Sequence, residues 1–155
     1  MIQENPRWHG KTTLEQGELR DLTATWRDWA KIEPLPLRER FDPIDFPKLL
    51  PWIVLMEILP EAPELDARIR YVGTEIVHYF NSDHITGKTL SDLGPIYWDR
   101  WADVGRQVVE ARGPRYFQGA PFLVGKAHVD FEMLVLPLSK SGKTVDFLIM
   151  ALSRL

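Results

Sequence analysis

The stretch that most constrains the fold covers residues 67–80, because its residue pattern changes from that of a strand to that of a helix. Ile69 and Tyr71 alternate with arginines, which is the period of a strand with one buried face. Gly73 can end this strand, since glycine adopts backbone angles that are closed to other residues. The apolar residues of Ile76–Phe80 predict a short helix, which must then pack back on the sheet.

The chain before this stretch predicts one amphipathic helix and one strand. Residues 18–32 carry four apolar residues at helical spacing, which are Leu19, Leu22, Trp26 and Trp29. Pro34 ends this helix, because the residue before a proline avoids the helical conformation. Residues 52–59 are almost all apolar, which indicates a short strand covered on both faces.

The second half of the chain predicts a long helix followed by three strands. The helix covers about residues 96–112 and ends at Gly113-Pro114. The strands are expected at residues 116–124, 128–139 and 144–152. Short links between strands favour an α+β fold with a five-stranded antiparallel sheet and helices on one face.

The expected organisation has three parts. Residues 1–17 are polar and without a period, which predicts a flexible N-terminal segment. Residues 18–33 form a flanking amphipathic helix, and residues 34–155 form the domain itself.

Composition limits the functions open to this chain. Its 155 residues carry a net charge of −3, so it has no general attraction for nucleic acid or anionic membranes. The absence of cysteine excludes disulfides, thiolate catalysis and cysteine-based zinc sites. No apolar run approaches the roughly 20 residues of a membrane span, and the N-terminus lacks the apolar core of a secretory signal. We therefore expect a cytoplasmic protein without a membrane or nucleic-acid partner.

Several motifs follow one another in a recognisable order. They are RYVGTEIV at residues 70–77, HITGKTL at 84–90 and LPLSKSGKTVDFLIM at 136–150. With these motifs, residues 34–155 resemble a bacterial PAS-domain family. The resemblance implies a sensory or protein-interaction module of bacterial signal transduction, with a cavity between the sheet and the helices that follow its second strand.

Transferred to this chain, the resemblance places a ligand cavity among residues of both later helices and the sheet. These residues are Tyr71, Ile76, His78, Tyr79, Phe80, Trp98, Trp101, Leu134, Leu136 and Met150. Tyrosine and tryptophan suit a small apolar or aromatic ligand, because each combines an apolar ring with a polar atom. The alternative is a solid core without a ligand. His78 is the only candidate for a haem ligand, and we expect neither a cofactor nor a metal.

A small cavity enzyme is the main alternative function. Asp130, Glu132 and Asp146 lie on strands expected to be neighbours, and one of them could act as the general base of an isomerase or dehydratase. Their alternation with apolar residues predicts instead that they face solvent, because a buried acid without a partner is costly. No nucleophile elbow or phosphate-binding loop is present. We therefore expect no enzymatic activity.

The apolar stripe of the first helix has two interpretations. Leu19, Leu22, Trp26 and Trp29 can cover the chain's own sheet, or they can form the interface of a homodimer. In the sensory interpretation this helix transmits the effect of a ligand to a second copy or to a signalling partner. A structural adaptor is a third possibility, and it predicts no cavity.

Overall fold

The computed structural model describes residues 8–80, 84–119 and 130–155. Its strands form one antiparallel sheet in the order β1-β4-β5-β6-β2-β3. The strands are β1 (His9–Lys11), β2 (Ile53–Ile58), β3 (Ala67–Val72), β4 (Arg115–Gly119), β5 (Phe131–Leu138) and β6 (Phe147–Arg154). The α-helices are α1 (Gly17–Ala30), α2 (Thr74–Phe80) and α3 (Pro95–Ala111). The predicted α+β fold is confirmed, with six strands among the described residues in place of the expected five.

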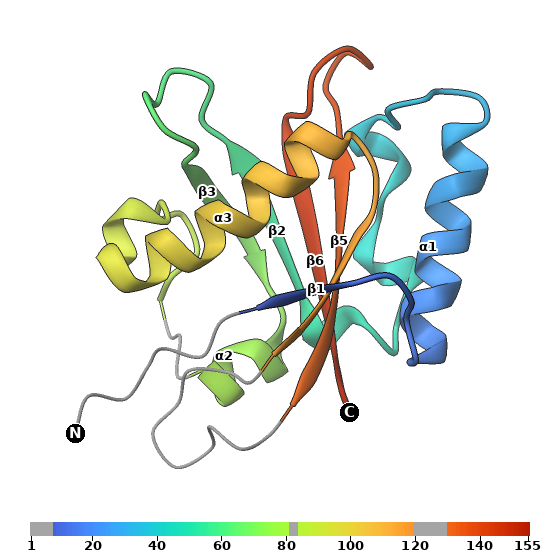
Figure 1. Ribbon diagram of the computed structural model, residues 1–155, viewed down its shortest axis with the longest axis horizontal. Helices are drawn as coiled ribbons and strands as arrows, with labels where there is room; N and C mark the ends of the chain where they lie inside the picture. Colours follow the sequence, from blue (N-terminus) through green and yellow to red (C-terminus); the bar gives the residue numbers. More distant parts are fainter. Residues whose placement is uncertain (1–7, 81–83, 120–129) are drawn as a thin grey trace.

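Helices cover both faces of this sheet (Figure 1). Ile76 from α2 and Val108 from α3 are buried in the apolar core on one face. Leu19 and Leu22 from α1 are buried in a second core on the opposite face. The helices after the second strand therefore lie together as expected, and the flanking helix covers the other face. Short 3-10 helices occupy the link from α1 to β2, at Arg38–Arg40, Pro43–Asp45 and Leu50–Trp52, and the chain before α3, at Ser91–Leu93.

Strand β5 is buried along its whole length because both faces of the sheet are covered. Successive side chains of a strand point to opposite faces. Met133 and Val135 accordingly join the core under α2 and α3, whereas Leu134 and Leu136 join the core under α1. A strand of this kind is apolar at nearly every position and gives no alternating pattern from which its two faces can be told apart.

Helix α1 docks on the sheet through the stripe that the sequence predicts. Leu19 and Leu22 are fully buried, and burying a leucine stabilises a fold by about 1.5–3 kcal/mol. Trp26 is buried as well, and its indole N–H donates to the carbonyl oxygen of Pro137 at 2.9 Å. The pairing of β4 with β5 ends at Val135, two residues before Pro137. The Trp26 indole therefore gives the Pro137 carbonyl a hydrogen-bond partner where β4 no longer pairs. Trp29, the last residue of the stripe, is only half-buried.

A β-bulge in β3 changes which side chains share a face. Leu55 pairs with Tyr71 and the next residue, Met56, pairs with Ile69, so Arg70 is the extra residue. A bulge of this kind reverses the alternation of side chains at that point. Ile69 therefore lies in the core under α2 and α3, and Tyr71 packs against the core under α1.

Gly73 is required for space, not for an unusual backbone angle. Its φ is not among the positive values found at three other glycines. A Cβ atom here would lie 2.3 Å from both the carbonyl carbon and the oxygen of Pro51. The close approach of the chain before β2 to the end of β3 thus excludes any side chain.

The segment before α1 crosses the edge of the sheet. The side chain of Trp8 is buried in the core under α2 and α3, and that of Leu14 in the core under α1. Between them β1 pairs with β4 and forms one edge of the sheet (Figure 1). Residues 8–16, which the sequence analysis assigns to a flexible segment, therefore supply a strand and two buried side chains.

The position of α1 can be tested with Leu22→Asp. An unpaired charge at this buried site should destabilise the fold by about 3 kcal/mol or more. We expect loss of helical circular dichroism and a lower urea midpoint, with Ala24→Asp, an exposed position on the same helix, as the control. A folded monomer from Leu22→Asp, obtained from a wild-type dimer, would show instead that the stripe packs between copies.

Candidate functional site

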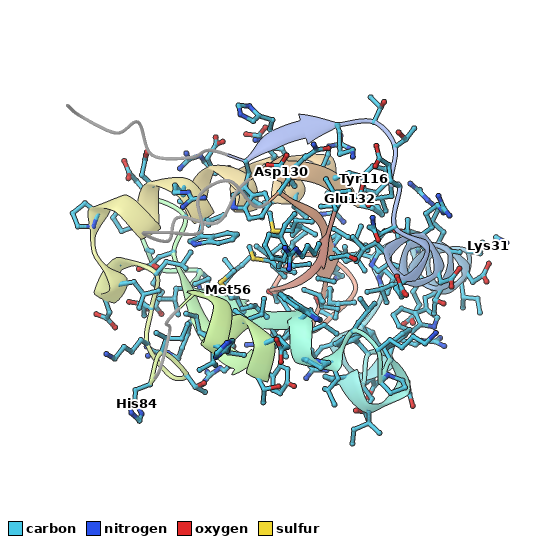
Figure 2. All side chains as sticks on the ribbon, turned by 90° about the horizontal axis from the view of Figure 1, so that it is seen from below. Lys31, Met56, His84, Tyr116, Asp130 and Glu132 are labelled. Carbon is cyan, nitrogen blue, oxygen red and sulfur yellow. The ribbon has the colours of Figure 1, made fainter. Side chains whose placement is uncertain are left out.

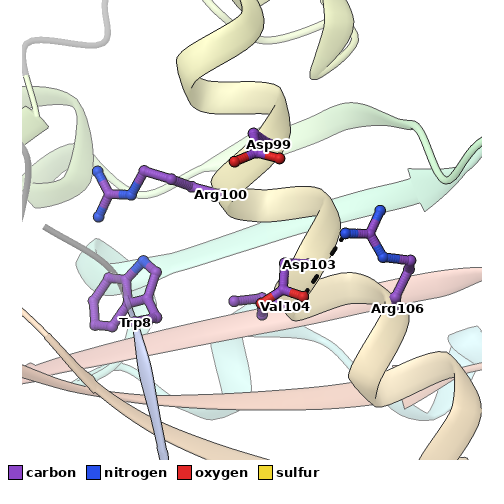
Figure 3. A pocket seen from close by; sticks show the side chains of 6 residues that line it. All are labelled: Trp8, Asp99, Arg100, Asp103, Val104 and Arg106. Atoms are coloured by element: carbon purple, nitrogen blue, oxygen red, sulfur yellow. Dashed lines mark ion pairs between the residues drawn. The ribbon is translucent and has the colours of Figure 1, made fainter. Parts of the chain in front are cut away.

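A surface pocket of about 270 Å³ lies between α3 and the chain just before β1 (Figure 3). Trp8, which precedes β1, forms one wall, and residues from successive turns of α3 form the other. The α3 residues are Asp99, Arg100, Asp103, Val104 and Arg106. Its volume is slightly below the 300–1,000 Å³ that is usual for drug-sized ligands. The pocket therefore suits a small metabolite.

The buried wall of the pocket carries hydrogen-bond donors. The side chain of Trp8 is only 8% exposed, and its indole Nε1 has no acceptor among the described residues. Arg100 is also buried, and its guanidinium lies above the indole in Figure 3. The Trp8 ring contacts Trp101, with ring centroids 5.7 Å apart. Buried polar groups in proteins almost always have a partner, whereas the described residues offer no acceptor to the Trp8 N–H.

The outer wall of the pocket carries carboxylates. Asp99 and Asp103 are four residues apart and therefore lie on the same side of α3. Both are exposed, and Asp103 is 3.7 Å from the guanidinium of Arg106 (Figure 3). Val104 adds an apolar surface that is 1% exposed. The pocket thus combines donors on its buried side with acceptors on its solvent side.

A second polar cluster surrounds Glu132 on the face that α1 covers. The Glu132 side chain is fully buried and lies 2.7 Å from the Nζ of Lys11. Its two oxygens also accept hydrogen bonds from the backbone N–H groups of Glu15 and Gln16, which immediately precede α1. Lys11 also donates to Gln118 at 3.0 Å. Figure 2 labels Glu132 on β5 and Tyr116 on the neighbouring strand β4. The carboxylate thereby joins β1, β4, β5 and the start of α1.

Opposing effects act on the pKa of Glu132. Burial alone would raise it, but the Lys11 ammonium and the N–H groups of Gln16 and Glu15 hold the pKa below its ordinary value of 4.5. A group whose pKa is lower in the folded state stabilises the fold above its unfolded pKa. That contribution is lost as the pH falls through the folded value. At neutral pH Glu132 is therefore an ionised structural group.

The residues predicted for the ligand cavity fall into separate places. Ile76, Trp101 and Met150 belong to the core under α2 and α3 or pack against it. Leu134, Leu136 and Tyr71 belong to the core on the opposite face or pack against it. The His78 side chain is exposed. The side chains of Tyr79, Phe80 and Trp98 lie outside the described residues.

The structure therefore corrects that expectation for Leu134, Leu136 and Tyr71. One cavity cannot bring Leu134, Leu136 and Tyr71 together with Ile76, because the sheet separates them. Two causes account for the error. Because β5 is apolar at nearly every position, its two faces cannot be told apart from the sequence. The bulge at Arg70 places Tyr71 on the opposite face of the sheet from Ile69.

The three candidate acids also have different surroundings. Asp130 is exposed, as expected. Asp146 accepts hydrogen bonds from the backbone N–H of Lys140 at 2.7 Å and from the Thr144 hydroxyl at 3.0 Å, which is an arrangement that closes a turn. The expectation that Glu132 faces solvent is wrong, because α1 covers that face of the sheet. None of the three lines the pocket beside α3.

Sequence reasoning missed Trp8, Lys11 and Arg100. Trp8 and Lys11 lie in a segment without period, and Arg100 resembles any charge on an amphipathic helix. The one available signal was an apolar tryptophan in an otherwise polar stretch, since such a ring is seldom left in solvent.

An antiparallel sheet with helices on both of its faces defines an α+β domain. A family model described as PAS domain matches residues 14–152, so the chain belongs to the PAS domain family. Domains of this family are sensory and interaction modules. The match begins before α1 and thus includes the helix that the sequence analysis placed outside the domain. The curated proteins contain no match to this sequence.

No helix among the described residues is long and apolar enough to cross a membrane. No group of three or more metal-ligating side chains occurs in the described part of the chain.

The role of Lys11 can be tested with Lys11→Met. Leaving Glu132 buried with only two backbone donors should cost about 3 kcal/mol at pH 7. Loss of the ammonium should also raise the pKa of Glu132, so acid unfolding should begin at a higher pH than in the wild type. Circular dichroism between pH 7 and pH 2 measures this shift.

Lys31→Met is the matched control, because Lys31 forms an ion pair with Asp28 in which both side chains are more than 70% exposed. Such a pair contributes about 0–1 kcal/mol. Equal acid-unfolding midpoints for the two variants would contradict a structural role for the Lys11–Glu132 pair.

Proposed function

We propose that this chain is a non-enzymatic sensory module of bacterial signal transduction that binds a small molecule beside α3. The observation that carries the proposal is the pocket between Trp8 and α3, with an indole N–H that lacks an acceptor among the described residues. Membership of the PAS domain family supports a sensory role. Of the residues first expected to contact a ligand, Trp101 is the best placed, since its ring contacts that of Trp8.

The connection between the pocket and α1 supports a route for the signal. Trp8 is followed by β1, and three residues of extended chain, about 10 Å, lead from it to Lys11. Lys11 and the two residues before α1 all bind the carboxylate of Glu132. A displacement of Trp8 would therefore act on both the edge of the sheet and the start of α1. A ligand can produce such a change only if it binds one arrangement more tightly than the other.

The surroundings of Glu132 argue against the alternative of an enzyme. A general base needs a free lone pair near a substrate and a pKa close to the working pH. Glu132 accepts from Lys11 and two backbone groups, and its pKa is lowered. It also lies under α1, on the face opposite the core that contains Trp8.

We further propose that the module acts in the cytoplasm as a homodimer or with a signalling protein. Leu19, Leu22 and Trp26 are buried within the chain, so a dimer that used all of them would have to exchange α1 between copies. Trp29 is half-buried at the end of the same stripe and would remain available to a partner.

Native mass spectrometry of the freshly purified protein tests the proposal, because it reports bound small molecules and oligomeric state together. We expect one small molecule per chain, beyond the 18.0 kDa of the polypeptide. Trp8→Ala should lose this molecule, whereas Trp29→Ala, a tryptophan outside the pocket, should retain it. An empty wild-type protein would favour the structural adaptor, and retention by Trp8→Ala would move the site elsewhere.

A further inference from the structure

The segment of residues 8–16 is anchored to the rest of the described chain at both of its ends and in the middle. Trp8 is buried in the core under α2 and α3, and Leu14 is buried in the core under α1. Between these anchors the ammonium of Lys11 donates to the carboxylate of Glu132 at 2.7 Å. The chain that joins the anchors is thin, because β1 pairs with β4 over three residues and two of the three are exposed.

The same carboxylate lies at the start of α1. Gln16, the residue before this helix, makes no capping hydrogen bond with its side chain in the described part of the chain. The backbone N–H groups of Glu15 and Gln16 donate instead to the two oxygens of Glu132, at 2.8 Å each. A negative charge is also favourable at the N-terminus of a helix. One carboxylate of β5 therefore binds both the end of β1, through Lys11, and the residues from which α1 begins.

The burial of Glu132 disfavours partial opening of the segment. Its side chain is fully buried, so release of Lys11 alone would leave a buried charge without its ion partner, which is costly. Release of the whole segment lets water reach the carboxylate and replace the lost donors. A half-open arrangement is therefore less favourable than either end state, which is the condition for an all-or-none change.

Segments at the edge of a sheet, with few buried contacts, can open as cooperative units while the rest of a protein stays folded. We propose that residues 8–16 form a latch that opens and closes as one unit and that Glu132 fastens. Opening moves Trp8 away from the pocket beside α3 and separates Lys11 and the two backbone donors from Glu132. This inference rests on the proposed sensory function and supplies its regulation, because the latch links the wall of the pocket to the start of α1.

Amide hydrogen exchange of the full chain without added ligand, followed residue by residue by NMR, tests the latch. Two groups of amides are compared, those of β1 that its pairing with β4 protects and those of Glu15 and Gln16. We expect both groups to exchange through one opening, with the same protection factor and the same dependence on low concentrations of urea. Both should exchange at least tenfold faster than the amides of β5, which report unfolding of the whole domain. Different protection factors for the two groups would overturn the latch.

Trp8→Ala distinguishes a latch from independent anchors. The substitution removes contacts on the face of the sheet that α2 and α3 cover, yet it should speed exchange of the Glu15 and Gln16 amides at least tenfold. Glu132→Gln should speed exchange in β1 at least tenfold as well. Trp29→Ala is the matched control, because Trp29 packs against the core under α1 outside the latch, and it should leave exchange through the latch unchanged.

Two results with these variants would contradict the latch. Equal acceleration in the latch and in β5 would mean that the segment is only part of the common fold. Acceleration by Trp8→Ala in β1 without any in Glu15 and Gln16 would mean that the two anchors act independently. A variant that does not fold leaves the test intact, since the comparison within the wild-type chain decides by itself. No ligand is used, so the proposed function stands or fails separately, by native mass spectrometry.

Discussion

The covering of the sheet on both faces is the constraint on which the rest of the structure depends. Every residue of β5 from Phe131 to Leu138 is buried, so neither face of the strand can be left to solvent. Removing α1 would expose the apolar face that carries Leu134 and Leu136, at a cost of about 1.5–3 kcal/mol for each. The flanking helix is for this reason part of the folded unit. The same covering takes Glu132 out of water and creates the need for Lys11 and the backbone donors before α1.

The segment before α1 crosses the edge of the sheet and so connects its two covered faces. Trp8 is anchored in one core and Leu14 in the other, while Lys11 between them binds a carboxylate of the central sheet. A buried ion pair has little net value when compared with well-packed apolar residues, but breaking one partner is costly. Such a contact therefore fixes the register of β1 more than it adds stability. Lys11 links β1 to the start of α1, because both bind the same carboxylate.

The pocket beside α3 lies away from the central strands of the sheet. The described pocket uses one flank of α3 and the residue before β1, so its lining depends on how two elements meet and not on the sheet alone. Membership of the PAS domain family defines the module, whereas the side chains of α3 and the indole of Trp8 form the lining of this pocket. A fold by itself does not determine a function, because functional chemistry depends on particular side chains.

Local patterns in the sequence were sufficient for the elements themselves. The spacing of Leu19, Leu22 and Trp26 predicted α1 and its buried side, and the change of pattern after Tyr71 predicted β3 followed by α2, because hydrophobic period is a property of neighbouring residues. The antiparallel sheet followed from short links between strands.

Only the tertiary structure decided which residues share a face or a site. A strand buried on both sides has no alternation to reveal its faces, so Leu134 and Leu136 were placed with the wrong helices. The bulge at Arg70 depends on pairing with β2 and leaves no signal in the chain around it. Trp8 and Arg100 meet across more than ninety residues of sequence. Contacts of that kind depend on packing between distant segments, which no local pattern encodes.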